Sequence, residues 1–119
     1  MKRKIEISVG GVPEALDRFE QAWRRGVAGK KGAAEVRLTF ESLPVLLKNL
    51  TPARWTLIER LKRSGPLSIS ELARRLGRHY KNVHTDVTRL IEFGLIERRD
   101  DQRVVVTWDI VTAQMQLAA

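Results

Sequence analysis

Polar side chains recur on one side of a segment in the second half of the chain, and their types are those that read the edges of DNA bases. The spacing of apolar residues predicts a helix from about Tyr80 to Phe93, with Gly94 as its stop. An amide side chain can bridge two atoms of adenine, an ammonium group suits guanine, and the threonine methyl suits that of thymine. We therefore interpret the segment as a recognition helix in the major groove, with base contacts from Lys81, Asn82, Thr85 and Arg89.

The opposite side of this helix is apolar, as packing against a protein core requires. Its members recur at three- and four-residue steps: Tyr80, Val83, Val87, Leu90 and Ile91. The alternative interpretation of the polar side is an ordinary solvated helix face. The patterns before and after the helix favour the recognition helix.

A shorter helix and a glycine turn precede the predicted recognition helix. Its apolar residues share one face: Ile69, Leu72, Ala73 and Leu76. Ser70, or Ser68 with Glu71 three residues later, can cap its first turn. Gly77 suits a left-handed turn, where the chain stops and redirects. The pattern predicts a helix-turn-helix over residues 67–95.

A strand-turn-strand pattern follows the recognition helix. Residues 95–99 and 104–108 have strand character, and a polar turn at 100–103 separates them. A hairpin in this position is a wing. Its basic residues Arg98, Arg99 and Arg103 are expected to reach phosphates or an adjacent minor groove.

Further phosphate contacts are expected around the recognition helix. Arg78 precedes the helix, whose dipole favours an anion at that end. His79 and His84 are interpreted as capping or phosphate-contacting residues, because with Asp86 they do not match a metal-site spacing. The residues expected to contact the DNA backbone are Ser70, Arg74, Arg78, His79, His84, Thr88, Arg98, Arg99 and Arg103.

Asp86 places a carboxylate beside the predicted reading side, where DNA phosphates repel it. On the helical wheel it lies on the flank, towards the body of the domain. We expect an ion pair with Arg75 or Arg78 that aims the basic side chain, in preference to a contact with cytosine.

The rest of the chain contains further strand and helix patterns. Alternation predicts strands at 4–9 and 35–40 and a tail strand at 111–117, with a short helix as the alternative for the tail. Helical spacing predicts helices at about 13–28, 42–50 and 52–64, the last capped by Thr51. Because isolated two-stranded sheets are only marginally stable in water, the first two strands need a further strand, from the tail or from a second subunit.

These elements predict an α+β fold, a winged helix-turn-helix with an N-terminal strand-helix-strand extension. The extension at residues 1–41 is expected to serve dimerisation or partner binding. Residues 42–119 are expected to form the winged-helix DNA-binding domain with a C-terminal strand. Because helix-turn-helix readers usually pair half-sites, we expect a homodimer joined through the extension.

Composition agrees with a polyanionic partner. The net charge is +8, and eight basic residues lie between positions 54 and 81. The chain has no cysteine, which removes disulfides and thiolate zinc sites. No apolar run has the length of a membrane span and no signal peptide is indicated, so we expect a cytoplasmic protein with no membrane partner. No catalytic arrangement, metal site or cofactor site emerges, and enzymatic activity is not expected.

From Phe40 onward, about two-thirds of the chain resembles a family of winged-helix, loosely MarR-like transcriptional regulators of bacteria and archaea. The resemblance rests on residues 40–43, 50–52, Arg54, 71–74, Arg78, 81–84, 86–87, Leu90 and 94–95. It implies sequence-specific binding to double-stranded DNA and repression. Some members of the family look like antitoxins, which implies as an alternative that the N-terminal unit masks a small toxin. A sequence-neutral DNA or RNA binder is the remaining rival.

Overall fold

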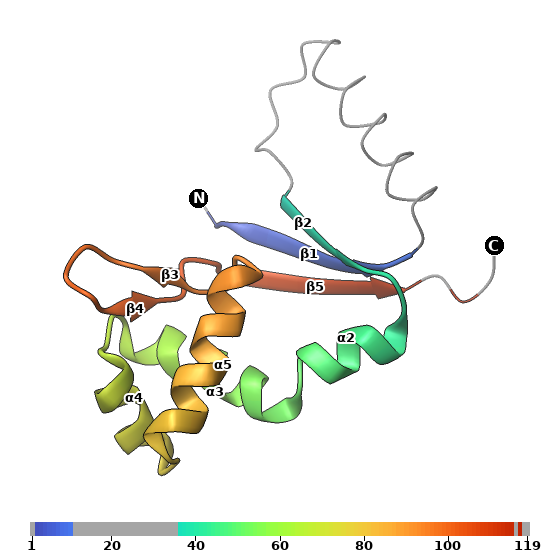
Figure 1. Ribbon diagram of the computed structural model, residues 1–119. Helices are drawn as coiled ribbons and strands as arrows, with labels where there is room; N and C mark the ends of the chain where they lie inside the picture. The colour runs from blue at the N-terminus through green and yellow to red at the C-terminus, as the bar shows by residue number, and fades with distance from the viewer. Residues whose placement is uncertain (1, 11–35, 116, 118–119) are drawn as a thin grey trace. The chain divides into compact units, whose positions relative to one another are not determined.

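The computed structural model describes residues 2–10, 36–115 and 117, and these form an α+β protein (Figure 1). The helix predicted at 13–28 lies outside the described residues. Two compact units are present, Met1–Asn49 with Asp109–Ala119 and, between them in sequence, Leu50–Trp108. The described elements are β1 (Lys4–Val9), β2 (Val36–Phe40), α2 (Leu43–Asn49), α3 (Pro52–Ser64), α4 (Ile69–Leu76), α5 (Tyr80–Glu92), β3 (Glu97–Arg98), β4 (Val104–Val105) and β5 (Ile110–Met115).

The first unit contains a three-stranded parallel sheet in the order β2-β1-β5 (Figure 1). Ile7 of β1 lies beside Leu38 of β2 and Ala113 of β5. The tail is a strand, and it supplies the third strand that the two N-terminal strands require. Ile5 and Ile7 are buried in the central strand, as their alternation predicts.

Ser8 is buried, although the alternation along β1 places it on the side opposite Ile5 and Ile7. It is only 1% exposed, and its hydroxyl lies 3.3 Å from that of Thr39 on β2. The burial is confined to one end of this face, because Lys4 on the same side is exposed and Glu6 is half-buried. A hydroxyl partner on the neighbouring strand makes this burial acceptable for a polar side chain.

The boundary between the units differs from the predicted one at residues 41 and 42. Helix α2 belongs with the sheet of the first unit, where it contacts β2. Residues 109–119 belong there too, because β5 pairs with β1 over its whole length. The second unit is therefore an insertion between two strands of one sheet.

The second unit packs α3, α4 and α5 around an aliphatic core and adds an antiparallel pair, β3 and β4 (Figure 1). The strands of this pair are shorter than predicted. Leu67, between α3 and α4, exchanges backbone hydrogen bonds with Val104 at 3.1 and 2.8 Å, so a third backbone segment joins the hairpin. Core residues exposed by 1% or less are Leu57, Leu61, Leu72, Val83, Val87, Leu90, Leu95, Ile96 and Val104.

Capping side chains and a glycine fix where the helices begin and end. Thr51 caps α3 as predicted, because its hydroxyl accepts from the Arg54 N–H at 3.3 Å. Ser68 caps α4 by accepting from the Glu71 N–H at 3.1 Å, whereas Ser70 lies exposed within the first turn. Gly77 ends α4 in the left-handed conformation, with φ 65° and ψ 32°. The turn from α4 to α5 is therefore the one that the sequence predicts.

Candidate nucleic-acid interface

Helix α5 begins with a histidine cap. The Nδ1 atom of His79 accepts from the Lys81 N–H at 3.2 Å, so the predicted capping role of His79 is confirmed. Tyr80 was predicted on the buried side, but it is 50% exposed and lies against His84, with ring centroids 5.9 Å apart. A residue in the first turn can extend past the packed part of a helix, and an i,i+4 partner then gives it a local contact.

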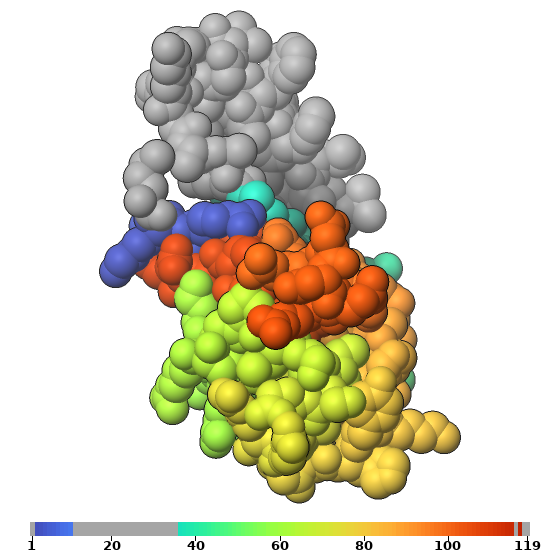
Figure 2. Space-filling view, turned by 90° about the vertical axis from the view of Figure 1, so that its left-hand side faces the viewer, coloured from blue at the N-terminus to red at the C-terminus, as the bar shows by residue number. Residues whose placement is uncertain are grey.

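The two sides of α5 differ as predicted beyond this first turn. Val83, Val87 and Leu90 are 0% exposed and fix the helix on the core of the unit. The polar residues are all exposed: Lys81, Asn82, His84, Thr85, Thr88 and Arg89. The side that carries the predicted base contacts is therefore available at the surface of the chain, and Figure 2 shows the start of α5 in gold at the surface of this unit.

Two of the predicted base-contacting residues already have hydrogen-bond partners. The Thr85 hydroxyl donates to the Lys81 carbonyl at 3.0 Å, so it can offer a base only an acceptor lone pair or its methyl group. Arg89 donates to Glu92 at 3.0 Å. Both of those side chains are more than half exposed, and such a pair stabilises a protein by less than about 1 kcal/mol. A nucleic acid can therefore displace Glu92 at small cost.

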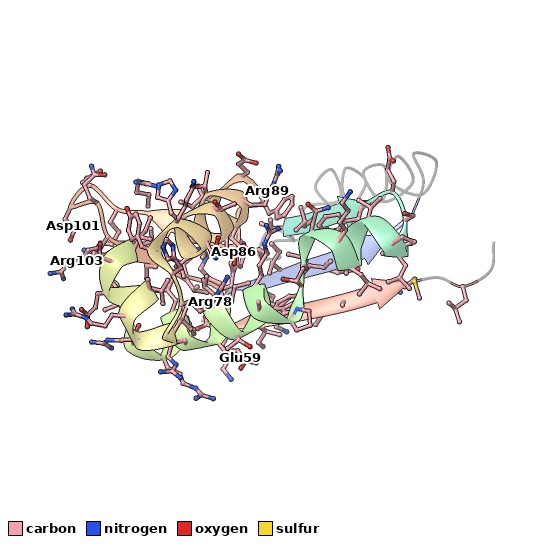
Figure 3. All side chains as sticks on the ribbon, turned by 60° about the horizontal axis from the view of Figure 1, so that its bottom comes forward. Glu59, Arg78, Asp86, Arg89, Asp101 and Arg103 are labelled. Carbon is pink, nitrogen blue, oxygen red and sulfur yellow. The ribbon has the colours of Figure 1, made fainter. Side chains whose placement is uncertain are left out.

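Asp86 joins three segments of the second unit. One carboxylate oxygen accepts from Arg54 Nε at 3.0 Å and the other from an Arg78 terminal nitrogen at 2.8 Å. Figure 3 labels Asp86 and Arg78. Asp86 and Arg54 are 14% and 15% exposed, so this network is largely shielded from solvent. The predicted pair with Arg78 is confirmed, and the alternative with Arg75 is wrong.

Arg54 is a participant that sequence reasoning missed. It lies in the first turn of α3, 32 residues from Asp86, and no periodic pattern links the two positions. The network also limits Arg78, which was predicted to contact phosphate. Its guanidinium is held by Asp86, and its other terminal nitrogen is buried without a hydrogen-bond partner among the described residues. Arg78 therefore positions the start of α5 in this structure.

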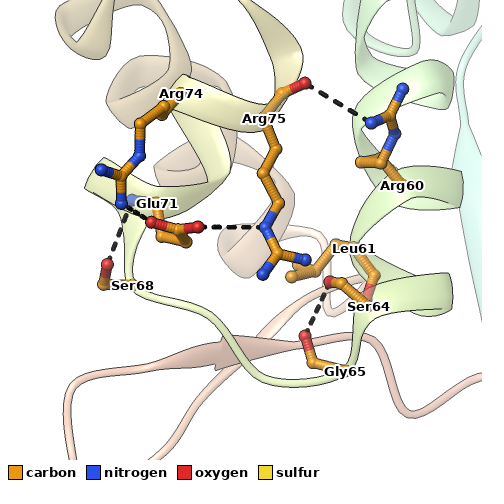
Figure 4. Close-up of polar contacts among 8 residues, drawn as sticks. All are labelled: Arg60, Leu61, Ser64, Gly65, Ser68, Glu71, Arg74 and Arg75. Carbon is orange, nitrogen blue, oxygen red and sulfur yellow. Dashed lines mark hydrogen bonds and ion pairs between the residues drawn. The ribbon is translucent and has the colours of Figure 1, made fainter.

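Glu71 holds the two arginines at the end of α4. It forms ion pairs with Arg74 and with Arg75, the latter at 3.1 Å (Figure 4). Arg60 of α3 donates to the Arg75 carbonyl at 3.4 Å, where the C-terminal end of α4 favours a cation. Arg75 is therefore occupied within this cluster, which explains why it does not reach Asp86. Arg74, a predicted backbone contact, remains 77% exposed on its side chain.

The hairpin of β3 and β4 presents its arginines to solvent. Its turn is closed by the Arg99 N–H, which donates to the Arg103 carbonyl at 2.7 Å, and by Gln102 with φ 69°. The Asp101 carboxylate accepts from the Arg103 N–H at 3.1 Å. The side chains of Arg98, Arg99 and Arg103 are exposed, and Arg103 lies at the tip in Figure 3. The predicted polar turn at residues 100–103 is therefore present, and the three arginines of the hairpin lie at the surface.

The hairpin is tied firmly to the end of α5. The N–H groups of Leu95 and Ile96 donate to the Leu90 carbonyl at 3.0 and 3.3 Å, and both side chains are 1% exposed. The Trp108 indole donates to the Gly94 carbonyl at 2.8 Å from the far side of the hairpin. Backbone and side-chain hydrogen bonds therefore connect the helix and the hairpin, both of which carry exposed cationic side chains. In Figure 2 the hairpin, in orange, also reaches the surface of this unit.

Other kinds of site find no support in the part of the chain that the structure describes. Among those residues, no group of three or more histidine or acidic side chains is placed to hold a metal ion. None of the helices described is both long enough and apolar enough to cross a membrane.

The chain is a small α+β protein in which a helical unit is inserted, in sequence, between two strands of a parallel sheet. The helical unit has exposed cationic side chains. The sequence model of the HVO_A0114 family matches residues 49–113, and the chain belongs to that family. The match spans the second unit and the first four residues of β5. No curated protein and no solved structure matches the chain significantly. The family's name states no activity, so the resemblance to MarR-like regulators stays a prediction.

Proposed function

We propose that the protein is a sequence-specific DNA-binding transcriptional regulator that acts as a repressor, and that its second unit is a winged helix-turn-helix. In this proposal α4 and α5 are the helix-turn-helix pair, and the hairpin of β3 and β4 is the wing. The segment at Leu67, which pairs with Val104, is the third strand of the small sheet at the base of the wing.

The observation that carries the proposal is the exposure of the polar side of α5. Lys81, Asn82 and Thr85 lie within the first two turns of this helix, where a recognition helix contacts base edges. Their side chains offer donors, an acceptor and a methyl group, which together distinguish base pairs in the major groove. Val83 and Val87 of the same helix are fully buried, so the helix cannot rotate without exposing its apolar side.

The exposed arginines of the hairpin supply the sequence-independent part of the affinity in this proposal. Phosphate contacts position a protein on the duplex, and contacts to base edges give the specificity. Arg98, Arg99 and Arg103 extend from the strands that are anchored to the end of α5. In this proposal, a duplex that contacts α5 in its major groove meets these cations along its backbone.

Selection of bound sites from a random pool of DNA duplexes tests the proposal. We expect a consensus to emerge, and we expect the selected duplex to compete at physiological salt about 10³-fold better than a shuffled duplex of the same composition. Equal competition by both duplexes would contradict the proposal and would indicate a sequence-neutral binder. Single-stranded RNA of the same length serves as the second competitor.

A protein partner is the second candidate, and one observation favours it. Helix α2 buries none of its residues, and Leu43, Val45 and Leu47 are 37–57% exposed. An antitoxin that masks a small toxin would use such a surface, which belongs to the first unit but lies just after the predicted extension at residues 1–41. The test is affinity capture with the full chain, because the sheet of the first unit includes β5. Capture that survives in a Leu47→Lys variant would argue against α2 as the contact.

A further inference from the structure

Strand β5 forms one edge of the parallel sheet in the first unit (Figure 1). It pairs with β1 from Ile110 to Met115, and among the described residues no strand lies on its other side. Residues 112–115 are all exposed. An edge strand of this kind presents a row of backbone donors and acceptors to its surroundings.

The hydrogen bonds with β1 show which backbone groups point outward. The Ile110 N–H donates to the Arg3 carbonyl at 3.1 Å, so the backbone groups of Ile110 face β1. Backbone groups alternate between the two sides of a strand, and those of Thr112 and Gln114 therefore face β1 as well. The outward groups belong to Val111, Ala113 and Met115.

The β5 edge lacks the features that usually prevent edge-to-edge pairing. Its sequence from Ile110 to Met115 contains no charged residue and no proline. The opposite edge, β2, is one residue shorter and carries Arg37. A chain of net charge +8 repels its own copies, so two copies associate best where neither contributes a charge. Of the two edges, only β5 meets this condition.

We propose that two copies of the chain associate through antiparallel pairing of their β5 strands, with the two-fold axis at Ala113. Outward backbone groups must meet outward groups, and the register centred on Ala113 is the one that pairs all three outward residues, Val111, Ala113 and Met115, with outward residues of the other copy. Val111 then lies opposite Met115 of the second copy, and Thr112 lies opposite Gln114. This register is self-complementary, pairs no like charges and joins two three-stranded sheets into one continuous sheet.

The pairing goes beyond the proposed function. It rests on that function in one respect only, which is that a dimer of DNA-binding proteins binds two half-sites. It also moves the expected dimer contact from the predicted N-terminal extension to the tail strand. A wild-type chain that is monomeric but selects a DNA consensus overturns the pairing and leaves the proposed function standing. A dimer that binds all duplexes equally overturns the proposed function and leaves the pairing standing.

A single cysteine tests the register, because the natural chain contains none. In the full chain carrying Ala113→Cys, the two Cα atoms of the central pair are expected about 5.5 Å apart, within the range that a disulfide spans. Mild oxidation should therefore give a disulfide-linked dimer in high yield. Val36→Cys, exposed on the β2 edge, is the matched control and should stay monomeric on a non-reducing gel. Equal cross-linking of the two variants would overturn the pairing.

Two further substitutions test the association without any cross-link. Ala113→Lys places two ammonium groups opposite each other at the axis, and Ala113→Pro removes an N–H that points away from β1. Sedimentation should show a dimer for the wild type and for Val36→Lys, and a monomer for both Ala113 variants, all with unchanged circular dichroism. A wild-type monomer at high micromolar concentration overturns the pairing, as does a dimer that persists in Ala113→Lys.

Discussion

At the scale of single residues, the polar side chains of α5 have two roles: some are exposed and can contact a ligand, and one holds the helix in place. Asn82 and Lys81 are exposed near the start of the helix. Asp86, one turn further on, faces Arg54 and Arg78. Residues of similar polarity on one helix therefore have different roles, and burial distinguishes them.

We expect Asn82→Ala and Lys81→Ala to weaken binding to the selected DNA site by about 1–3 kcal/mol each and to relax the preference at one base pair. The reason is the loss of a base contact while the backbone contacts remain. Titration of each variant against the selected duplex and its single-base-pair variants measures both effects. Lys48→Ala, which removes an exposed cation from α2, should leave affinity and preference unchanged. Unchanged binding by both α5 variants would exclude this reading side.

Arg103→Ala is expected to act differently, because Arg103 is exposed at the hairpin tip and is proposed to contact phosphate. It should weaken binding to all duplexes by a similar factor and reduce the slope of log K against log salt by about 1. Arg99→Ala should behave in the same way. The measurement is a titration at several salt concentrations with the selected and the shuffled duplex. A loss confined to the selected duplex would instead indicate that Arg103 reads bases.

At the scale of elements, the Asp86 network fixes α5 relative to α3 and to the turn after α4. Each oxygen of one carboxylate is bound by a different arginine, at 3.0 and 2.8 Å, from segments that are distant in sequence. Hydrogen bonds between charged groups are stronger than neutral ones, and partial burial increases their effect. The orientation of the polar side of α5 therefore depends on a residue that does not belong to that side.

We expect Asp86→Ala to lower the free energy of unfolding by about 2–3 kcal/mol, because it leaves the cations of Arg54 and Arg78 partly buried without their carboxylate. Chemical denaturation followed by circular dichroism measures the change. Glu92→Ala is the matched control, since it breaks an exposed ion pair on the same helix and should cost less than about 1 kcal/mol. Equal losses for the two variants would show that the Asp86 network has no special role.

The helices, the turn at Gly77 and the hairpin could be predicted because their signals are local. The spacing of Val83, Val87 and Leu90 and the cap at Thr51 act within a few residues of the chain. The choice of Ser68 over Ser70 is also local, and the capping-box spacing to Glu71 anticipates it. The second arginine on Asp86 could not be predicted, because residues 54 and 86 meet only after α3 and α5 have packed.

The sheet shows the same limit. Alternation identified its strands, but neither their parallel direction nor the burial of Ser8 can be read from alternation alone. Both depend on contacts between segments that are distant in sequence, such as the Ser8 and Thr39 hydroxyls on β1 and β2. The polar side of α5 was predicted residue by residue, whereas the unit boundary after Asn49 was not.

At the scale of the whole molecule, the first unit is assembled from both ends of the described chain, and the second unit lies between them in sequence. The Asp109 N–H donates to the Arg3 carbonyl at 2.8 Å, and its carboxylate accepts from the Arg3 N–H at the same distance. The helical unit has its own core and closes on itself through the bond from Trp108 to Gly94. Each unit therefore has its own network of contacts.

We expect deletion of residues 109–119 to remove the sheet and to spare the helical unit. Amide hydrogen exchange should show loss of protection at Ile5 and Ile7, because β1 loses a partner on one side, with protection retained at Val87 and Leu90. Thr112→Pro, which removes an N–H that faces β1, should give the same pattern to a smaller degree. Loss of protection at all four positions would show that the units do not fold independently.

The pairing of β1 with β5 has a consequence for biosynthesis. The ribosome synthesises β1 and β2 long before residues 110–115. Until β5 has been synthesised, the edge of β1 that pairs with it has no partner strand. The helical unit, whose contacts lie within Leu50–Trp108, needs no residue after Trp108 and can therefore form without β5. The parallel sheet therefore cannot be completed until β5 has been synthesised, and its formation depends on contacts between residues that are far apart in the sequence.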